Sequence, residues 1–296
     1  MLKTKVLKSL SYFDVFNHPL TKHEIGTLCL NGEAKHLLHE AIDSLLNEGI
    51  CYEFDGYLSF HKNVKELVEK RRYKEKEAKA YFDKLPFYAR IIKSFPFVRG
   101  IAISGSLSKN VMHEGGDIDY FIITTAGRLW ICRTMLVLFK KLFLFNSRKY
   151  FCVNYFVDET NLEIIDKNVF TAIEVTHLAA VYNSSLIDNL KQVNSWTKEY
   201  IPNFNHPLDL EAFEGNGKIK QAVEKLFYGG FGDRIDLLLM RLTYKRWSKK
   251  FKHFDPKKLE LTMRSNRGIS KHHPRDFQNK VLREYTHRLN KLEINS

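Results

Sequence analysis

Residues 100–124 read Gly100-Ile-Ala-Ile-Ser-Gly-Ser-Leu-Ser-Lys-Asn-Val-Met-His-Glu-Gly-Gly-Asp-Ile-Asp-Tyr-Phe-Ile-Ile-Thr124 and carry the strongest pattern in the chain. The pattern predicts an apolar strand, a turn of small residues at Gly105-Ser106, and a second strand that begins with Asp117 and Asp119. Side chains two positions apart on a strand share a face, so we expect two adjacent carboxylates. Such a pair repels itself unless a cation lies between, and hard oxygen ligands suit Mg²⁺. The turn offers N–H groups and a hydroxyl to a phosphate.

Composition indicates a chain that can bury a core and form two or three domains, with 296 residues of which 44% are hydrophobic. Lys and Arg number 47 against 34 acidic residues, for a net charge of +13. This surplus favours polyanionic partners such as nucleotides or nucleic acid, although a basic solvated surface gives the same count. Four cysteines without a Cys-x-x-Cys pair favour a reducing, cytoplasmic location and argue against structural zinc.

No part of the chain reads as a membrane segment. The apolar run from Leu129 to Phe145 is interrupted by Arg133, Lys140 and Lys141, which favours a helix buried in the protein. The first residues predict a short amphipathic helix rather than a signal peptide.

Residues 1–62 predict a separate module of three helices and a hairpin. Thr21 and Glu24 form a capping box, and a third helix is expected from about Lys35 to Asn47. Asp55-Gly56 lies between two alternating runs, which indicates a hairpin. This order resembles a winged helix, whose third helix would enter a DNA groove. The exposed residues expected on that helix are weakly charged, which favours a protein contact or packing over DNA reading.

The remaining chain divides into three predicted segments. Residues 63–96 predict a charged connecting helix and, between Pro86 and Pro96, a second short helix. Residues 97–168 predict a core of strands and one apolar helix, including a strand over 149–158. Residues 169–296 predict a basic helical region, with a helix over 169–181 and a polar loop at 270–275. Between them a long helix is expected over 218–251, disturbed by Gly229, Gly230 and Gly232. The last 57 residues hold 16 Lys and Arg against 5 acidic residues.

The Gly105-Ser106 turn, followed after ten residues by Asp117-Ile-Asp119, resembles the nucleotidyltransferase superfamily of the DNA polymerase beta type. The likeness covers about residues 97–165. Further segments, including Thr171-Ala172-Ile173-Glu174 and Asn194-Ser195-Trp196, resemble a poorly characterised bacterial branch of it.

The resemblance implies an α/β (α+β) fold: a nucleotidyltransferase-type mixed sheet with flanking helices, here with the N-terminal winged-helix-like module and the C-terminal helical region. It implies that Gly105 and Ser106 hold the phosphates of a nucleoside triphosphate, with help from Lys109. It also implies that Asp117 and Asp119 are catalytic and bind two Mg²⁺ ions. The reaction would be in-line attack on the α-phosphate with release of pyrophosphate. The acceptor stays open; RNA or another polyanion could use the basic C-terminal region.

The family's third carboxylate has no direct equivalent. The predicted strand offers Asn154 in its middle, and an amide is no base at neutral pH. Asp158 would share its face, but some 13 Å further along. Glu174 is an alternative acid, although a surface or capping role fits its helix as well. The alternative to an enzyme is therefore a regulatory protein of the same fold that binds nucleotide or nucleic acid without turnover.

A few side chains of the C-terminal region are further candidates. His272 and His273 suit either a phosphate contact or a surface turn. Trp196 and Trp247 fit packing positions. The basic residues of the long helix suit either a face for a polyanion or a solvated face; they are Lys245, Arg246, Lys249 and Lys250.

Overall fold

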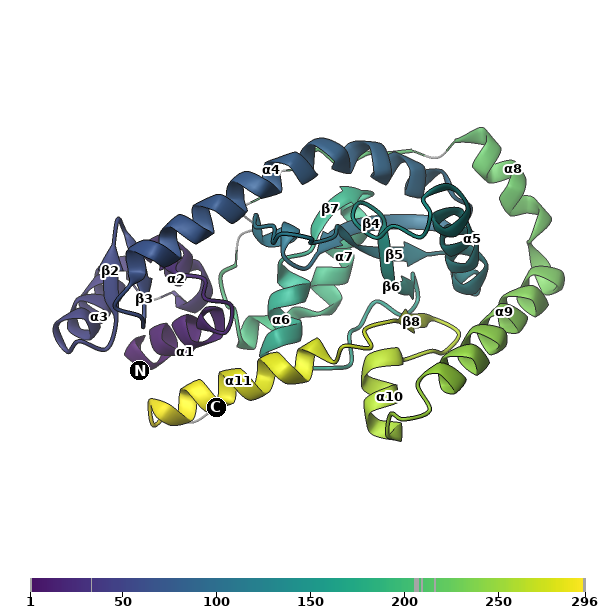
Figure 1. Cartoon of the computed structure of the whole chain (residues 1–296). Helices are drawn as coiled ribbons and strands as arrows, with labels where there is room; N and C mark the ends of the chain where they lie inside the picture. Colours follow the sequence, from purple (N-terminus) through teal and green to yellow (C-terminus); the bar gives the residue numbers. More distant parts are fainter. Residues whose placement is uncertain (1, 33, 205–207, 209, 216, 295–296) are drawn as a thin grey trace.

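A five-stranded mixed sheet lies at the centre of the molecule (Figure 1). The computed structural model describes residues 2–32, 34–204, 208, 210–215 and 217–294. In spatial order the strands are β7 (Ala179–Tyr182), β4 (Val98–Ser104), β5 (Asp119–Thr124), β6 (Cys152–Asp158) and β8 (Ile269–Lys271). Only the β5–β6 pair is parallel, and its crossover is α5 (Leu129–Phe143). The expected mixed α/β class is confirmed.

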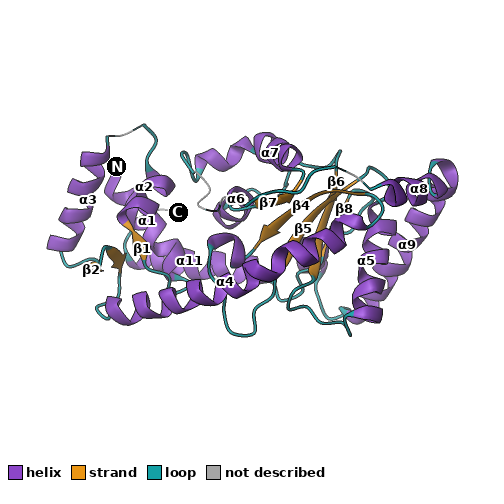
Figure 2. Cartoon of the chain, turned by 90° about the horizontal axis from the view of Figure 1, so that it is seen from above, coloured by secondary structure: helices purple, strands orange, loops and turns teal. Residues whose placement is uncertain are grey.

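Helices cover both faces of the sheet, which explains why β5 is a continuous run of aromatic and aliphatic residues from Tyr120 to Ile123. Tyr120 and Ile122 pack into one core, with α4 (Val64–Ser94), α5 and α9 (Gly229–Lys250). Phe121 and Ile123 pack into the other, with α6 (Val169–Thr176) and α7 (Ser184–Val193). Figure 2 shows α4 running lengthwise past the sheet from the N-terminal end of the molecule. A strand that is buried on only one face alternates apolar and polar residues, whereas β5 is buried on both faces and shows no such alternation.

α4 corrects one prediction, because a single helix of 31 residues replaces the two helices expected around Pro86. Pro86 is exposed on α4, whereas its neighbours Leu85 and Ala89 are buried in the core. The backbone bond that proline cannot make is therefore lost where water can replace it. Packing of the buried side keeps the helix continuous.

Two short edge strands contradict the expectation of an entirely helical C-terminal region. The helix expected over 169–181 ends as α6 at Thr176, and the following residues form β7 against β4. The polar loop expected at 270–275 begins instead as β8, paired with β6. Each strand has only three or four residues, and its partner in the sheet, rather than its own sequence, determines its conformation.

The N-terminal module contains the three helices and the hairpin that were predicted, and a short strand that was not predicted extends the hairpin to a three-stranded sheet. Its elements are α1 (Leu2–Asp14), β1 (Leu20–Thr21), α2 (Lys22–Cys29), α3 (Lys35–Asn47), β2 (Tyr52–Phe54) and β3 (Tyr57–Ser59). The capping box of Thr21 and Glu24 is confirmed, and so are the bounds of the third helix. Asp55 and Gly56 both have positive φ angles in the hairpin turn, which matches the Asp-Gly signal.

The core of this module extends beyond residue 62. Val281, Tyr285 and Leu289 of α11 (Phe277–Lys291) pack into it together with Ile173 of α6. Arg288 of α11 also pairs with Asp14 of α1, at 2.6 Å. Figure 1 shows α11 returning below the sheet to α1, so that both ends of the chain lie on the same side of the molecule.

The C-terminal region contains α8 (Lys218–Leu226), α9, α10 (Pro256–Met263) and α11. The single helix expected over 218–251 is two helices, because Gly229 takes a positive φ of 72° and lets the chain turn between them. Within the described residues, no helix has both the length and the apolar character needed to cross a bilayer.

Candidate metal and phosphate site

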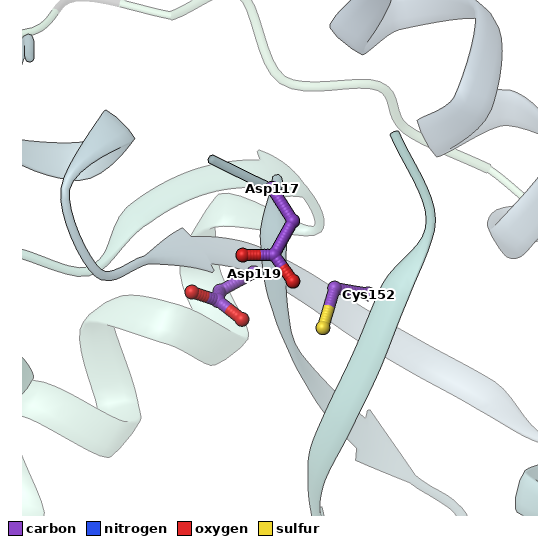
Figure 3. Close-up of side chains that lie close together, drawn as sticks. All are labelled: Asp117, Asp119 and Cys152. Atoms are coloured by element: carbon purple, nitrogen blue, oxygen red, sulfur yellow. The ribbon is translucent and has the colours of Figure 1, made fainter. Parts of the chain in front are cut away.

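The two carboxylates come together at one end of the sheet. Asp119 is the first residue of β5, and Asp117 lies in the loop just before it. Cys152 begins the neighbouring strand β6 and is paired with Asp119 in the sheet. A carboxylate oxygen of each aspartate and the Cys152 Sγ all lie within 4.8 Å of one another (Figure 3).

The loop that carries Asp117 is held by α4. The Met112 N–H donates to the Lys74 carbonyl at 3.0 Å, and the Tyr81 hydroxyl donates to the Gly116 carbonyl at 3.1 Å. The long helix thus fixes the segment between the turn and the carboxylate pair.

Asn154 lies beside the pair and orients one of its members. Its Nδ2 donates to Asp119 Oδ1 at 2.9 Å. The β5–β6 register shifts here, so that Tyr120 faces Val153 whereas Phe121 faces Tyr155, with Asn154 as the extra residue of a bulge. The regular alternation expected for this strand is therefore wrong beyond Asn154. The side chain of Asn154 still points to the site.

Burial and charge make Asp119 an unusual carboxyl group. Burial and the neighbouring Asp117 carboxylate raise the pKa of Asp119 from its ordinary 3.8 to about 7. The hydrogen bonds from Asn154 and Cys152 act in the opposite direction, and Glu174 adds to the rise. A cation between the aspartates would remove this repulsion.

Cys152 is buried, and its thiol lines the site, a role that the spacing of the cysteines did not predict. Burial, followed by the charges of Asp119 and Asp117, raises the pKa of the Cys152 thiol far above its usual range. Without a metal ion, the thiol therefore stays protonated and donates to the carboxylates. The carboxylate oxygens of the pair suit Mg²⁺ or Mn²⁺.

The Gly105-Ser106 turn packs directly against the carboxylate pair. Gly105 has a φ of 69°, and a Cβ atom there would lie 2.8 Å from Asp119 Oδ2. Both the backbone conformation and this close approach require glycine. The Ser108 Oγ and the Lys109 Nζ each donate to the Gly105 carbonyl, both at 3.0 Å, and thereby brace the turn.

Glu174 of α6 occupies the donors of this turn. Its Oε2 accepts from the Gly105 N–H at 3.3 Å, and its Oε1 pairs with Lys109 Nζ at 2.8 Å. The sequence offered Glu174 only as an alternative acid, since nothing in its spacing connects α6 with the turn. The structure brings this third carboxylate to the pair, on the side of β4.

Asp158 lies apart from the site. It pairs with Thr124 at the far end of the strands, five residues along β5 from Asp119. Its Oδ1 accepts from the backbone and hydroxyl of Thr160 and from Asn161, which closes the turn after β6. Its role is to hold that turn.

A cavity of about 560 Å³ opens from Asp117, Asp119 and Asn154 on the side of β6. Its walls come from α5 and the loop after it, from α9, and from the segment between β8 and α11. Seven basic side chains line it: Arg133, Lys140, Lys141, Arg148, Arg246, Lys250 and Arg275. The sequence prediction included only two of them, Arg246 and Lys250.

The two candidate histidines also lie in this cavity. His272 stacks near Trp247, with 4.8 Å between ring centroids. Burial lowers the pKa of His272 to about 3 and that of His273 to about 4, so both rings are neutral at pH 7. Trp247 is buried against Trp130, whereas Trp196 packs elsewhere and donates to Asn194 at 3.0 Å.

Comparisons with models of protein families, with curated proteins and with solved structures found no match. Function must therefore be inferred from the site itself.

Proposed function

We propose that the protein is a Mg²⁺-dependent nucleotidyltransferase, which moves a nucleoside monophosphate from a nucleoside triphosphate to an acceptor and releases pyrophosphate. The observation that carries the proposal is the contact between two elements. The carboxylates of Asp117 and Asp119 lie together, and the Gly105 turn packs against Asp119 so closely that only glycine fits. A metal-binding pair and a phosphate-binding turn are thus adjacent.

The ligand set suits Mg²⁺. The carboxylate oxygens of Asp117 and Asp119 are hard ligands, and the raised pKa of Asp119 marks a charge that a cation would stabilise. Asp117 and Asp119 would hold two ions, which supply charge stabilisation at the attacking and leaving oxygens. Asn154 orients Asp119 through its hydrogen bond to Oδ1.

The turn would bind the triphosphate. The Gly105 N–H and Lys109 Nζ, which Glu174 engages in this structure, would change partner to phosphate oxygens, and the Ser106 hydroxyl would add a third donor. The acceptor hydroxyl oxygen attacks the α-phosphorus, and a new P–O bond forms. The bond from that phosphorus to the bridging oxygen breaks, and pyrophosphate leaves. The hydroxyl proton passes to solvent water, and the Asn154 amide takes no part in this transfer, since an amide is no base at neutral pH.

Two observations favour a second candidate, a protein of the same fold that binds nucleotide or nucleic acid without turnover. Asn154 stands on the strand where a third carboxylate is expected, and Glu174 takes up the N–H of the turn. This candidate retains nucleotide binding and lacks transfer.

The test is incorporation of radiolabelled nucleotide with Mg²⁺ and a panel of acceptors. We expect incorporation in the wild type and its loss in Asp117→Ala and Asp119→Ala. Cys152→Ser is the matched control, since a hydroxyl can still donate to the carboxylates, and it should retain activity. Tight triphosphate binding without incorporation into any acceptor would favour the second candidate. Loss of activity with Cys152→Ser would point to a thiolate-bound metal instead.

We further propose that residues 1–62 form a winged-helix-like module that acts in protein packing. Support comes from the packing of α11 on this module and from Arg71 of α4, whose guanidinium binds the Pro19 carbonyl and Glu24. Electrophoretic titration with duplex DNA at several salt concentrations tests this. Weak binding with flat salt dependence is expected, and steep salt dependence would instead indicate contacts to the DNA backbone.

A further inference from the structure

We infer that the basic cavity beside the carboxylate pair binds the acceptor, and that this acceptor is a small molecule carrying at least two phosphate groups. The inference rests on the proposed nucleotidyl transfer and names the substrate class of the same site.

The charges of the cavity are the first support. Seven Lys and Arg side chains line it, and among the residues that the structure describes its acidic ones are only Asp117 and Asp119, at one end. Across the described part of the chain, none of these seven forms an ion pair, whereas Arg99, Arg128 and Arg264 elsewhere each bind a carboxylate within 3.0 Å. So many uncompensated cations around one cavity suit a multiply charged anion.

Arg133 of α5 is the second support, because its charge is buried and unpaired. The residue is 8% exposed, and its Nε has no hydrogen-bond partner among the residues that the structure describes. Its guanidinium lies 4.7 Å from the Trp247 ring centroid and 5.6 Å from that of Trp130. Burying such a group without a partner is costly, and a guanidinium is shaped to bind a phosphate through two N–H groups.

Neighbouring groups confirm that the cations are close together. Lys140 is half buried, and its pKa is lowered by burial and by the charges of Arg148 and Arg133. The pKa of His272 is lowered first by burial and then also by the charges of Arg133, Arg148 and Lys250. These groups come from α5, the loop after it and α9, so three separate segments of the chain bring positive charge to the same cavity.

The position of the cavity indicates that it holds the acceptor and not the nucleoside triphosphate that donates the nucleotide. In the sheet, β5 lies between β4, which leads into the Gly105 turn, and β6, which borders the cavity. In-line transfer at a two-metal site places the attacking and leaving oxygens on opposite sides of the phosphorus. With the triphosphate on the turn, the hydroxyl that attacks comes from the cavity side.

The size of the cavity favours a small molecule. Its volume of about 560 Å³ lies within the range of about 300–1,000 Å³ typical of small-molecule sites. Trp247 and His272 give it an aromatic wall. The end of a nucleic-acid strand is the competing occupant.

The binding test uses inorganic tripolyphosphate as the probe, with EDTA and without Mg²⁺, followed by calorimetry. We expect saturable binding that weakens as salt increases. The double variant Arg246→Gln/Lys250→Gln should weaken binding at least tenfold. The control Lys245→Gln/Lys249→Gln removes the same charge from the same helix, but outside the cavity, and should change the affinity less than twofold.

Equal losses in the two double variants, or no binding, would overturn the inference. So would binding of a 5′-phosphorylated oligonucleotide more than tenfold tighter than tripolyphosphate, which would identify a strand end as the occupant. Arg133→Met, which keeps an apolar chain between the two tryptophans, should also lose affinity while the protein stays folded.

A second measurement separates this inference from the proposed function. If the wild type transfers nucleotide to a neutral acceptor and Arg246→Gln/Lys250→Gln does so equally well, the inference fails and the function stands. If tripolyphosphate binds in the cavity but no acceptor is ever labelled, the function fails and the anion site stands.

Discussion

Asp119 combines burial with a like charge beside it, and this has a measurable effect on stability. Its pKa is about 7 in the folded, metal-free protein against an ordinary value of 3.8. Because the folded-state pKa is the higher one, the stabilising contribution present below pH 3.8 is lost as the pH rises towards 7. Above pH 7 the ionised group lies buried beside Asp117.

We therefore expect Asp119→Asn to raise the melting temperature in EDTA at pH 8 by about 4 °C or more, and by clearly less at pH 5. The amide oxygen can still accept from Asn154. Thermal unfolding at the two pH values measures this, with the exposed Asp188→Asn as the control. An equal shift at both pH values would contradict the assigned charge.

Glu174 gives a second prediction, because its carboxylate occupies the donors assigned to the triphosphate. Glu174→Gln removes a negative charge from the Gly105 N–H and Lys109. We expect a non-hydrolysable triphosphate to bind about fivefold more tightly, from the loss of one like charge at close range. Calorimetry with Mg²⁺ checks this, and the exposed Glu163→Gln is the control. Weaker binding would instead make Glu174 part of the metal site.

For individual residues, the sequence predicted those members of the site that are close together in the chain. Gly105, Asp117 and Asp119 belong to one strand–turn–strand unit, so their spacing alone indicated their proximity. Glu174 and Arg133 reach the site from helices whose packing no local pattern determines. Their contribution therefore became visible only in the folded chain.

Among the elements, α4 gives the clearest prediction. Pro86 lies within its 31 residues and leaves one backbone carbonyl without its helical partner. We expect Pro86→Ala to raise the free energy of unfolding by about 1–2 kcal/mol, since the regained bond exceeds the extra entropy of the unfolded chain. Urea unfolding measures this, with Asp83→Ala on the same exposed side as the control. A loss of stability would indicate that the proline ring itself packs.

Element by element, prediction succeeded where short-range chemistry determines the structure. The capping box of Thr21 and Glu24 and the turn at Asp55-Gly56 are examples. It failed at β7 and β8, which are strands only because β4 and β6 offer them an open edge. It also missed the bulge at Asn154, because an inserted residue leaves the apolar pattern of a doubly buried strand unchanged.

For the whole molecule, the important contact is that of α11 with the N-terminal module. Leu289 is fully buried in the core of that module. We expect Leu289→Ala to cost about 2–5 kcal/mol and to increase hydrogen exchange in α1. Mass-spectrometric exchange detects this, with the exposed Thr286→Ala on the same helix as the control. Unchanged exchange in α1 would show that the module is stable without α11.

The packing of α11 on α1 has a consequence for synthesis on the ribosome. α1 is synthesised before α11, so Tyr12, which is buried against Tyr285 in the folded protein, has no partner from α11 until that helix is made. Until then, an apolar face of α1 is open to water and to chaperones. The N-terminal module is thus completed only after α11 has been synthesised.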